Sequence, residues 1–197
     1  MKVGILAGSH RDAETHRIAG FIQDRLQAEF KVETFFYSLA NNPMPLWDES
    51  AWDDSSDLVK QFVNPLVEKL AECDALIICV PEWGGMVPGG LKNLLLYLTD
   101  GCVAFKPAYL VGISSSRGGA YPIAELRMSS YKNSQIFYLP EHLIVRDCES
   151  MFYEDSDDSY LRGRLDYGLR LLLESAKLLK PLQSSGLIDL EKYPYGM

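Results

Sequence analysis

The sequence predicts an α/β domain in which helices cover both faces of a five-stranded parallel sheet. Five short apolar segments alternate with stretches whose apolar residues recur at helical spacing. Parallel strands need such helical crossovers, which place helices on the two faces and give three layers. The chain has 197 residues, of which 47% are hydrophobic, enough for one sizeable core. We therefore expect a single domain over residues 1–197, with an irregular tail from about residue 182.

Each expected strand has its own pattern. The first apolar segment ends at Gly8, and the second alternates apolar and charged residues before two aromatics. The third is apolar without interruption, which indicates burial on both faces. The last contains Pro140, which predicts a split or a bulge. The five segments are residues 3–7, 31–37, 75–80, 108–113 and 135–145.

The expected helices follow the strands. They cover residues 18–26, a stretch around Pro65, residues 88–100, residues 121–131 and a long final helix to about residue 179. Acidic residues 155–158 are expected in the first turn of that final helix, because negative charge is favourable there. Five strands in one domain favour the flavodoxin-like order 2-1-3-4-5. In that order the loops after strands one, three and four meet, and a ligand lies between them.

Composition argues against several classes of partner. The net charge is −8 and no dense basic stripe is present, so a nucleic-acid partner is not expected. The four cysteines form no C-x-x-C pair and no zinc spacing, which favours reduced thiols in a cytoplasmic protein without a metal site. No apolar stretch reaches the roughly 18 residues of a membrane span, so no membrane partner is expected.

Residues 81–92 form the most informative segment. It joins a buried strand to a helix, and it places Trp83 beside several glycines. Ligands of open α/β sheets bind at this end of a strand, and glycine lets main-chain N–H groups approach a flat ligand closely. A second interpretation is that Trp83 is an ordinary core aromatic.

The loop after the first strand suits a phosphate. Ser9, Arg11 and Thr15 lie where a helix begins, so hydroxyls, a guanidinium and free N–H groups come together. The loop matches neither common glycine-rich phosphate motif. The alternative is an ordinary turn with an exposed arginine.

These motifs together resemble the NAD(P)H-dependent FMN reductase family, which includes bacterial chromate and quinone reductases. The matching residues are Gly8, Ser9 and Arg11, then Pro81 to Trp83 and 87–93, and the resemblance extends to about residue 145. It implies a flavodoxin-like fold, bound FMN, NAD(P)H as reductant, and a homodimer or homotetramer with the active site near a subunit interface. The cofactor-binding residues that it implies are Ser9, Arg11, Thr15 and His16 in the first loop, Pro81, Glu82, Trp83, Gly84 and Gly85 against the flavin ring, and Ser115, Ser116, Gly118 and Gly119 along its border.

The resemblance also implies the chemistry. Hydride passes from NAD(P)H to N5 of FMN and then to a small acceptor such as a flavin, a quinone or a metal oxyanion, and the flavin supplies the reactivity. We nominate no catalytic acid or base. A carboxylate beside an anionic reduced flavin is unfavourable, so Glu82 is expected to contribute its backbone.

The sequence departs from the family pattern in three places. Trp83-Gly84 replaces the usual Tyr-Asn, and the first loop is one residue short, with Glu14 where serine is common. We expect Glu14 to point to solvent while Thr15 supplies the hydroxyl. The acidic segment 48–57 has no family counterpart and is expected to cover the flavin or to meet a partner subunit.

Three other functions compete with a reductase. A flavodoxin-type electron carrier fits the acidic composition, but its phosphate loop is richer in threonine and glycine and lacks an arginine like Arg11. A serine hydrolase is the second, because residues 112–116 begin like a nucleophile elbow, but Ser116 stands where that motif needs its closing glycine. A flavin-free binding protein on the same fold is the third, because fold does not fix function.

Overall fold

Five parallel strands form one sheet in the order β2-β1-β3-β4-β5 in the computed structural model, which describes residues 1–99 and 101–193. The predicted flavodoxin-like order is therefore confirmed. The strands are β1 Lys2–Ala7, β2 Glu33–Ser38, β3 Ala75–Pro81, β4 Pro107–Ile113 and β5 Phe137–Val145.

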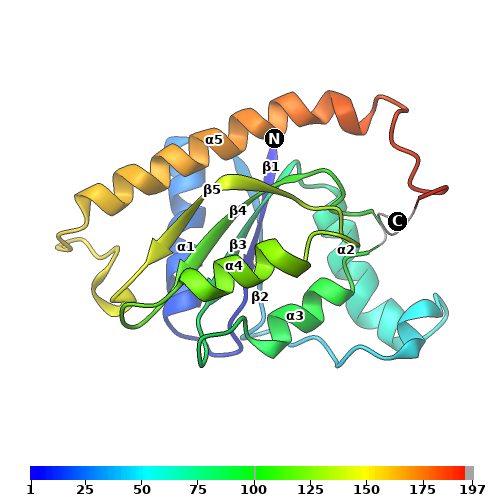
Figure 1. Cartoon of the computed structure of the whole chain (residues 1–197), viewed down its shortest axis with the longest axis horizontal. Coiled ribbons are helices and arrows are strands. Elements are labelled where there is room, and N and C mark those ends of the chain that lie inside the picture. The colour runs from blue at the N-terminus through cyan, green and yellow to red at the C-terminus, as the bar shows by residue number, and fades with distance from the viewer. Residues whose placement is uncertain (100, 194–197) are drawn as a thin grey trace.

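Helices cover both faces of the sheet and give the predicted three layers (Figure 1). Helices α1 and α5 pack on one face, and α2, α3 and α4 pack on the other. Neighbouring residues of one strand serve opposite faces, so Ile77 joins the first core and Ile78 the second. The helices are α1 Glu14–Glu29, α2 Asn64–Ala71, α3 Gly89–Leu96, α4 Ala120–Ser129 and α5 Ser159–Gln183, with short helical turns at Glu49–Trp52, Val59–Val63 and Cys148–Ser150.

Several helix ends differ from the prediction. Helix α1 is longer than the expected 18–26 at both ends, and α5 continues to Gln183, past the expected end near residue 179. Helix α3 ends at Leu96, and residue 100 lies outside the described part of the chain. The acidic cluster precedes α5 rather than occupying its first turn. The reason is that Asp158 accepts a hydrogen bond from the Phe152 N–H and pairs with Arg162, so its carboxylate holds the preceding segment. Within the described ranges, no helix combines the length and apolar character that crossing a bilayer requires.

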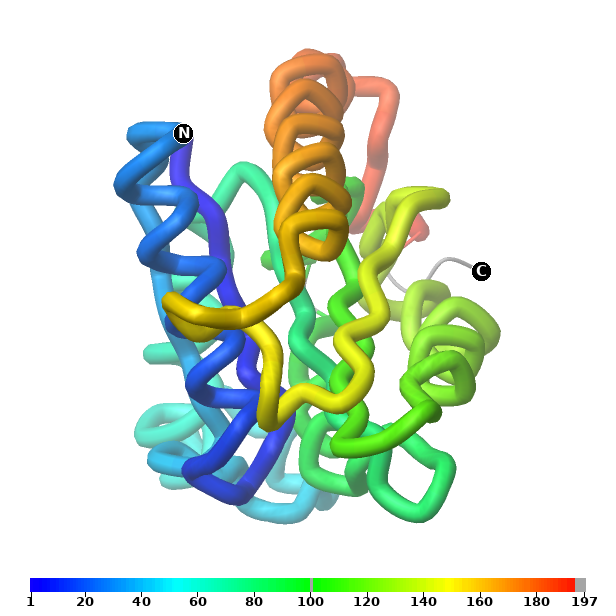
Figure 2. The backbone as a smooth tube through the Cα atoms, turned by 90° about the vertical axis from the view of Figure 1, so that its left-hand side faces the viewer, coloured from blue at the N-terminus to red at the C-terminus, as the bar shows by residue number. Residues whose placement is uncertain are grey.

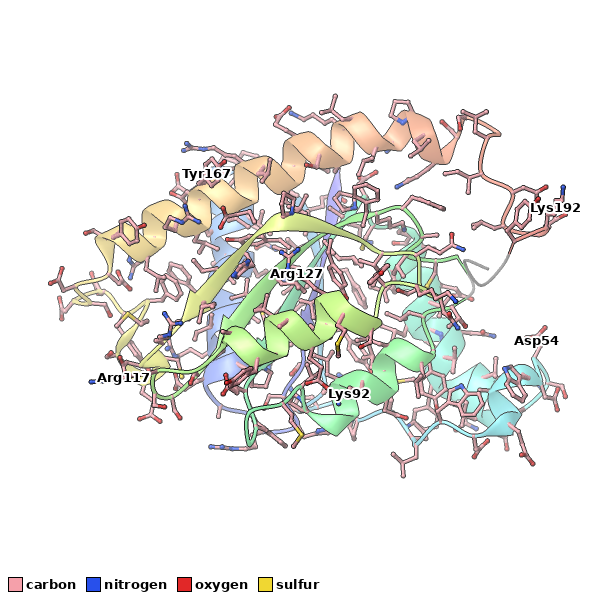
Figure 3. All side chains as sticks on the ribbon, in the orientation of Figure 1. Asp54, Lys92, Arg117, Arg127, Tyr167 and Lys192 are labelled. Carbon is pink, nitrogen blue, oxygen red and sulfur yellow. The ribbon has the colours of Figure 1, made fainter. Side chains whose placement is uncertain are left out.

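The predicted irregularity at Pro140 is confirmed. The pairing of β4 with β5 shifts from Ala108–Tyr138 to Leu110–His142. Arg127, which lies between α4 and β5 in Figure 3, donates hydrogen bonds to the carbonyl oxygens of 139–141 at 2.5–3.3 Å. The guanidinium therefore satisfies carbonyl groups that the bulge leaves without a strand partner.

The loops after β1, β3 and β4 come together at the carboxyl ends of the strands, at the lower end of Figure 2. Gly8 brings the first loop close to its neighbours, since its N–H donates to the Cys79 carbonyl oxygen at 2.9 Å. A Cβ atom at Gly8 would lie 2.6 Å from Cδ2 of Leu91 and 3.0 Å from the Cys79 oxygen. Only glycine fits between the strand and α3 at this position.

We expect Gly8→Ala to lower the free energy of unfolding by about 1–3 kcal/mol, the usual cost of overpacking a core. Denaturant unfolding measures this change. Gly20→Ala is the matched control, because a Cβ atom there meets nothing within 4 Å on a helix that alanine favours. Equal midpoints for Gly8→Ala and the unaltered protein would contradict the close packing.

Candidate cofactor site

A cavity of about 140 Å³ opens at the carboxyl rim of the sheet. It brings together residues that the sequence predicted from three separate loops, and it adds a fourth loop, after β5, that was not predicted. The predicted residues in its lining are Ser9, Arg11, Thr15, Pro81, Glu82, Trp83 and Ser115.

The first loop presents an anion site. Helix α1 begins after Ala13, and no side chain caps its first N–H groups. This end of the helix lies at the cavity, because residues 13–15 belong to the lining. Ser9 is buried and closes the turn, because its hydroxyl accepts the Arg11 N–H at 3.0 Å. Thr15 is only 4% exposed, and among the described residues its hydroxyl has no hydrogen-bond partner. An unpartnered hydroxyl, the Arg11 guanidinium and an uncapped helix end together fit a phosphate.

Glu14 also lines this cavity, so the expectation that it points to solvent is wrong. Arg17 binds the Glu14 carboxylate through Nε at 2.8 Å and Nη2 at 2.5 Å, which offsets the negative charge. The same Nη2 donates to the carbonyl oxygens of Cys148 at 2.8 Å and Met151 at 3.0 Å. Arg17 thus draws the loop after β5 against the start of α1.

This fourth loop contributes Cys148 and Glu149 to the lining. Burial raises the pKa of the Cys148 thiol, and the nearby Glu14 and Glu149 carboxylates act in the same direction. The thiol is therefore protonated at neutral pH and behaves as a small apolar wall. The sequence around Cys148 carries no motif that would have predicted this position.

Trp83 begins a tight hairpin turn. Its N–H and the N–H of Met86 each donate to the carbonyl oxygen of the other residue at 3.0 Å. Gly84 and Gly85 between them have φ values of +57° and +78°, as a type I′ turn requires at both central positions. The turn accounts for both glycines, which lie beside the cavity lining. Trp83 itself is 36% exposed, which excludes the interpretation as a core aromatic.

Glu82 joins the loop after β3 to the loop after β4. Its carboxylate accepts the Gly119 N–H, and its own N–H donates to the Ile113 carbonyl oxygen at 2.9 Å. A Cβ atom at Gly118 would lie 2.6 Å from the carboxylate, so glycine leaves room for this contact. Both the side chain and the backbone N–H of Glu82 are therefore engaged in hydrogen bonds within the protein.

Besides Gly84 and Gly85, four predicted residues lie outside the lining: His16, Ser116, Gly118 and Gly119. His16 places Nδ1 2.9 Å from the Ser38 hydroxyl oxygen and packs edge-on against Phe36, toward β2. Ser116 accepts the Asp147 N–H at its carbonyl oxygen, which fixes the loop after β4 to the loop after β5.

The segment before and within α3 holds the surrounding loops in place. A Cβ atom at Gly90 would lie 1.6 Å from the His10 ring, so the imidazole rests directly on this glycine. Lys92 pairs with Glu125 of α4, which also accepts the Val87 N–H at 2.8 Å. Burial alone would raise the pKa of the Glu125 carboxyl, but the contacts with Lys92 and Val87 prevail and lower it.

Asn93 is buried and clamps the loop after β2. Its Oδ1 accepts the Trp47 N–H at 2.8 Å, and its Nδ2 donates to the Pro45 carbonyl oxygen at 2.6 Å. The Tyr97 hydroxyl donates to the same oxygen at 3.0 Å. The acidic segment 48–57 follows this anchor and contributes no residue to the cavity lining.

Comparison with known proteins decides the family. The sequence profile described as NADPH-dependent FMN reductase matches residues 1–148. The chain belongs to this family. An FMN-dependent NADPH-azoreductase of Staphylococcus aureus is 28% identical over 174 residues, covering 88% of this chain and 90% of the relative. Among solved structures, the flavoenzyme NAD(P)H:(acceptor) oxidoreductase FerB of Paracoccus denitrificans has a TM-score of 0.70 at 20% identity, covering 90% of this chain and 98% of that one.

As an FMN reductase, the protein is an NAD(P)H-dependent oxidoreductase that uses FMN and NAD(P)H. The residues at the rim fit this cofactor. Among the described residues, the Thr15 hydroxyl in the cavity lining has no hydrogen-bond partner, and no side chain caps the start of α1. The enclosed volume of about 140 Å³ is below the roughly 300–1,000 Å³ of whole-ligand pockets. The cavity therefore has room for part of a ligand of this size and not for the whole of it.

We expect Asn93→Ala to lower the free energy of unfolding by about 1–3 kcal/mol, because it leaves the half-buried Trp47 N–H unpaired and removes one of the two donors to the Pro45 carbonyl oxygen. Hydrogen exchange should accelerate at the Trp47 amide. Asn133→Ala, at an exposed position, is the control and should change neither quantity. Unaltered protection at Trp47 would show that Asn93 does not hold the loop.

Proposed function

We propose that this FMN reductase transfers hydride from NAD(P)H to N5 of FMN held at the carboxyl rim, and then reduces a small acceptor. The acceptor is a flavin, a quinone, a metal oxyanion, or an azo compound as the name of the Staphylococcus aureus relative suggests. The observation that carries the proposal is the meeting of Arg11, the unpartnered Thr15 hydroxyl and the uncapped start of α1 in one cavity.

The first loop would bind the FMN phosphate. Arg11 supplies a bidentate cation, and Thr15 with the first N–H groups of α1 supplies neutral donors. Ser9 would shape the turn through its bond to the Arg11 N–H, and His16 would support the helix through Ser38. Glu14 opposes an anion at short range, so its pairing with Arg17 is a condition for phosphate binding.

The other loops would border the ring. Pro81 and Trp83 offer an apolar surface, and the N–H groups of Gly84 and Gly85 have no partner among the described residues. Ser115 lines the cavity from the loop after β4. Ser116, Gly118 and Gly119 of the same loop lie outside the lining and would border the ring beyond it. When bound, FMN accepts hydride and passes on two electrons, so the protein needs to orient the reactants rather than supply an acid or base. The Glu82 carboxylate is occupied by the Gly119 N–H, in agreement with that assignment.

The proposed setting is a cytoplasmic homodimer or homotetramer with neither a nucleic-acid nor a membrane partner. The net charge of −8 supports the exclusion of nucleic acid. Large apolar side chains are exposed on α3, α4 and the turn before α3, which supports a subunit interface on that face. They are Met86, Leu96, Tyr121 and Met128, each exposed by 54–75%.

The visible spectrum of the purified protein tests the function. We expect flavin absorption bands after purification or after addition of FMN at micromolar concentration, and bleaching by NADPH without oxygen. Bleaching without a separate reductase distinguishes an enzyme from a flavodoxin-type carrier. Colourless protein that does not bind FMN added at micromolar concentration would overturn the proposal.

Arg11→Ala should weaken FMN binding by about 1.5–3 kcal/mol, the contribution of a hydrogen bond to a charged group. Fluorescence titration of FMN into the apoprotein measures the change. The control is Arg170→Ala, which removes another exposed arginine on α5 and should leave the affinity as it is. Equal FMN affinities for the two variants would reject the phosphate site.

A further inference from the structure

A second and larger cavity, of about 470 Å³, lies at the other end of the sheet. Phe105 precedes β4 and Phe137 begins β5, so the cavity adjoins the amino ends of the strands, whereas the cofactor rim is at their carboxyl ends. Its volume falls within the roughly 300–1,000 Å³ of small-molecule sites. A molecule bound there would be separated from the cofactor rim by the length of the strands.

The segment after α5 closes one side of this cavity. Helix α5 ends at Gln183, the chain passes through Gly186 with φ of +70°, and it turns back on the right of Figure 1. Leu190 then packs on Gly101, where a Cβ atom would lie 2.9 Å from Cδ1 of Leu190. Gln183 Nε2 donates to the Phe105 carbonyl oxygen at 3.2 Å. The tail is thus tied down at both ends of the cavity and leaves the space between them unfilled.

Two lining residues hold an unfavourable backbone conformation. Phe105 and Gln135 have φ values of +56° and +55°, a region that side chains other than glycine rarely occupy. The Phe105 N–H donates to the Gln135 carbonyl oxygen at 2.8 Å, so the two positions are locked to each other. Strain of this kind clusters at ligand sites, where it fixes the walls before the ligand arrives.

The chemistry of the walls indicates the ligand class. Phe105, Ile136, Phe137 and Leu190 give an apolar surface that is half aromatic, and Lys132 also belongs to the lining. The Lys132 ammonium is exposed and has no ion-pair partner in the described ranges. The Asp189 carboxylate in the lining accepts the Lys192 N–H at 2.9 Å.

We propose that this cavity binds a small amphipathic anion, with a flat apolar body between Phe105 and Phe137 and a single carboxylate or sulfonate facing Lys132. The apolar body is favoured because it covers aromatic surface that water otherwise contacts. The anion is favoured because Lys132 is a cation of the lining for which the described part of the chain supplies no ion-pair partner. This is a binding site separate from the cofactor rim, and it does not depend on the proposed function.

The test uses 1-anilinonaphthalene-8-sulfonate, an aromatic sulfonate of this class, titrated into the full-length protein by fluorescence. We expect saturable binding to one site, with the same affinity with and without FMN. Lys132→Gln should weaken the affinity about tenfold, as for one charge-assisted contact. Phe105→Gly should weaken it by at least as much, and because glycine relieves the positive φ, this variant should still fold.

Lys60→Gln is the matched control, since it removes an exposed lysine whose ammonium contacts only the Ser55 carbonyl oxygen among the described residues. Saturable binding that both cavity variants weaken and the control does not will support the site. Unsaturable fluorescence, displacement of the probe by FMN, or equal affinities in Lys132→Gln and Lys60→Gln will overturn it. Colourless protein that does not bind added FMN would refute the proposed function and leave this result intact.

Discussion

The hydrogen bond from the Gly8 N–H to the Cys79 carbonyl oxygen continues the pairing of β1 with β3 past the end of β1. The candidate cofactor site depends on this contact, because it fixes the position of the first loop relative to β3 and α3. The buried Ser9 turn and the start of α1 follow directly from that point. The loop is packed between the fully buried strand β3 and the Leu91 side chain, which restrict its backbone conformation.

The charged groups at the rim explain how an acidic protein offers a place for an anion. Glu14 is paired with Arg17, and Glu82 accepts a backbone N–H from Gly119. Both carboxylates are thereby committed to the protein, whereas the Arg11 guanidinium and the Thr15 hydroxyl have no partner among the described residues. The electrostatic potential at the rim depends on the charged groups that have no partner there, and the net charge of −8 for the whole chain does not describe it.

Sequence patterns were sufficient for the sheet order and for the three loops at the rim, because strand burial, glycine positions and chain order are local properties. They failed where the placement depends on contacts between distant residues. Arg17 reaches Cys148 and Met151 across more than 130 positions, and no local pattern encodes that contact. The same limit applies to Asn93, whose role follows only from its bonds to the loop after β2. Helix periodicity also could not show that Asp158 is engaged with Phe152.

The guanidinium of Arg127 has a consequence for how copies of this protein can meet. It occupies the carbonyl oxygens of residues 139–141 on β5, the last strand on that side of the sheet. Those oxygens are what an incoming chain would need to extend the sheet, and Pro140 at the same place offers no N–H. Extension of the sheet through this edge into a fibre is therefore disfavoured.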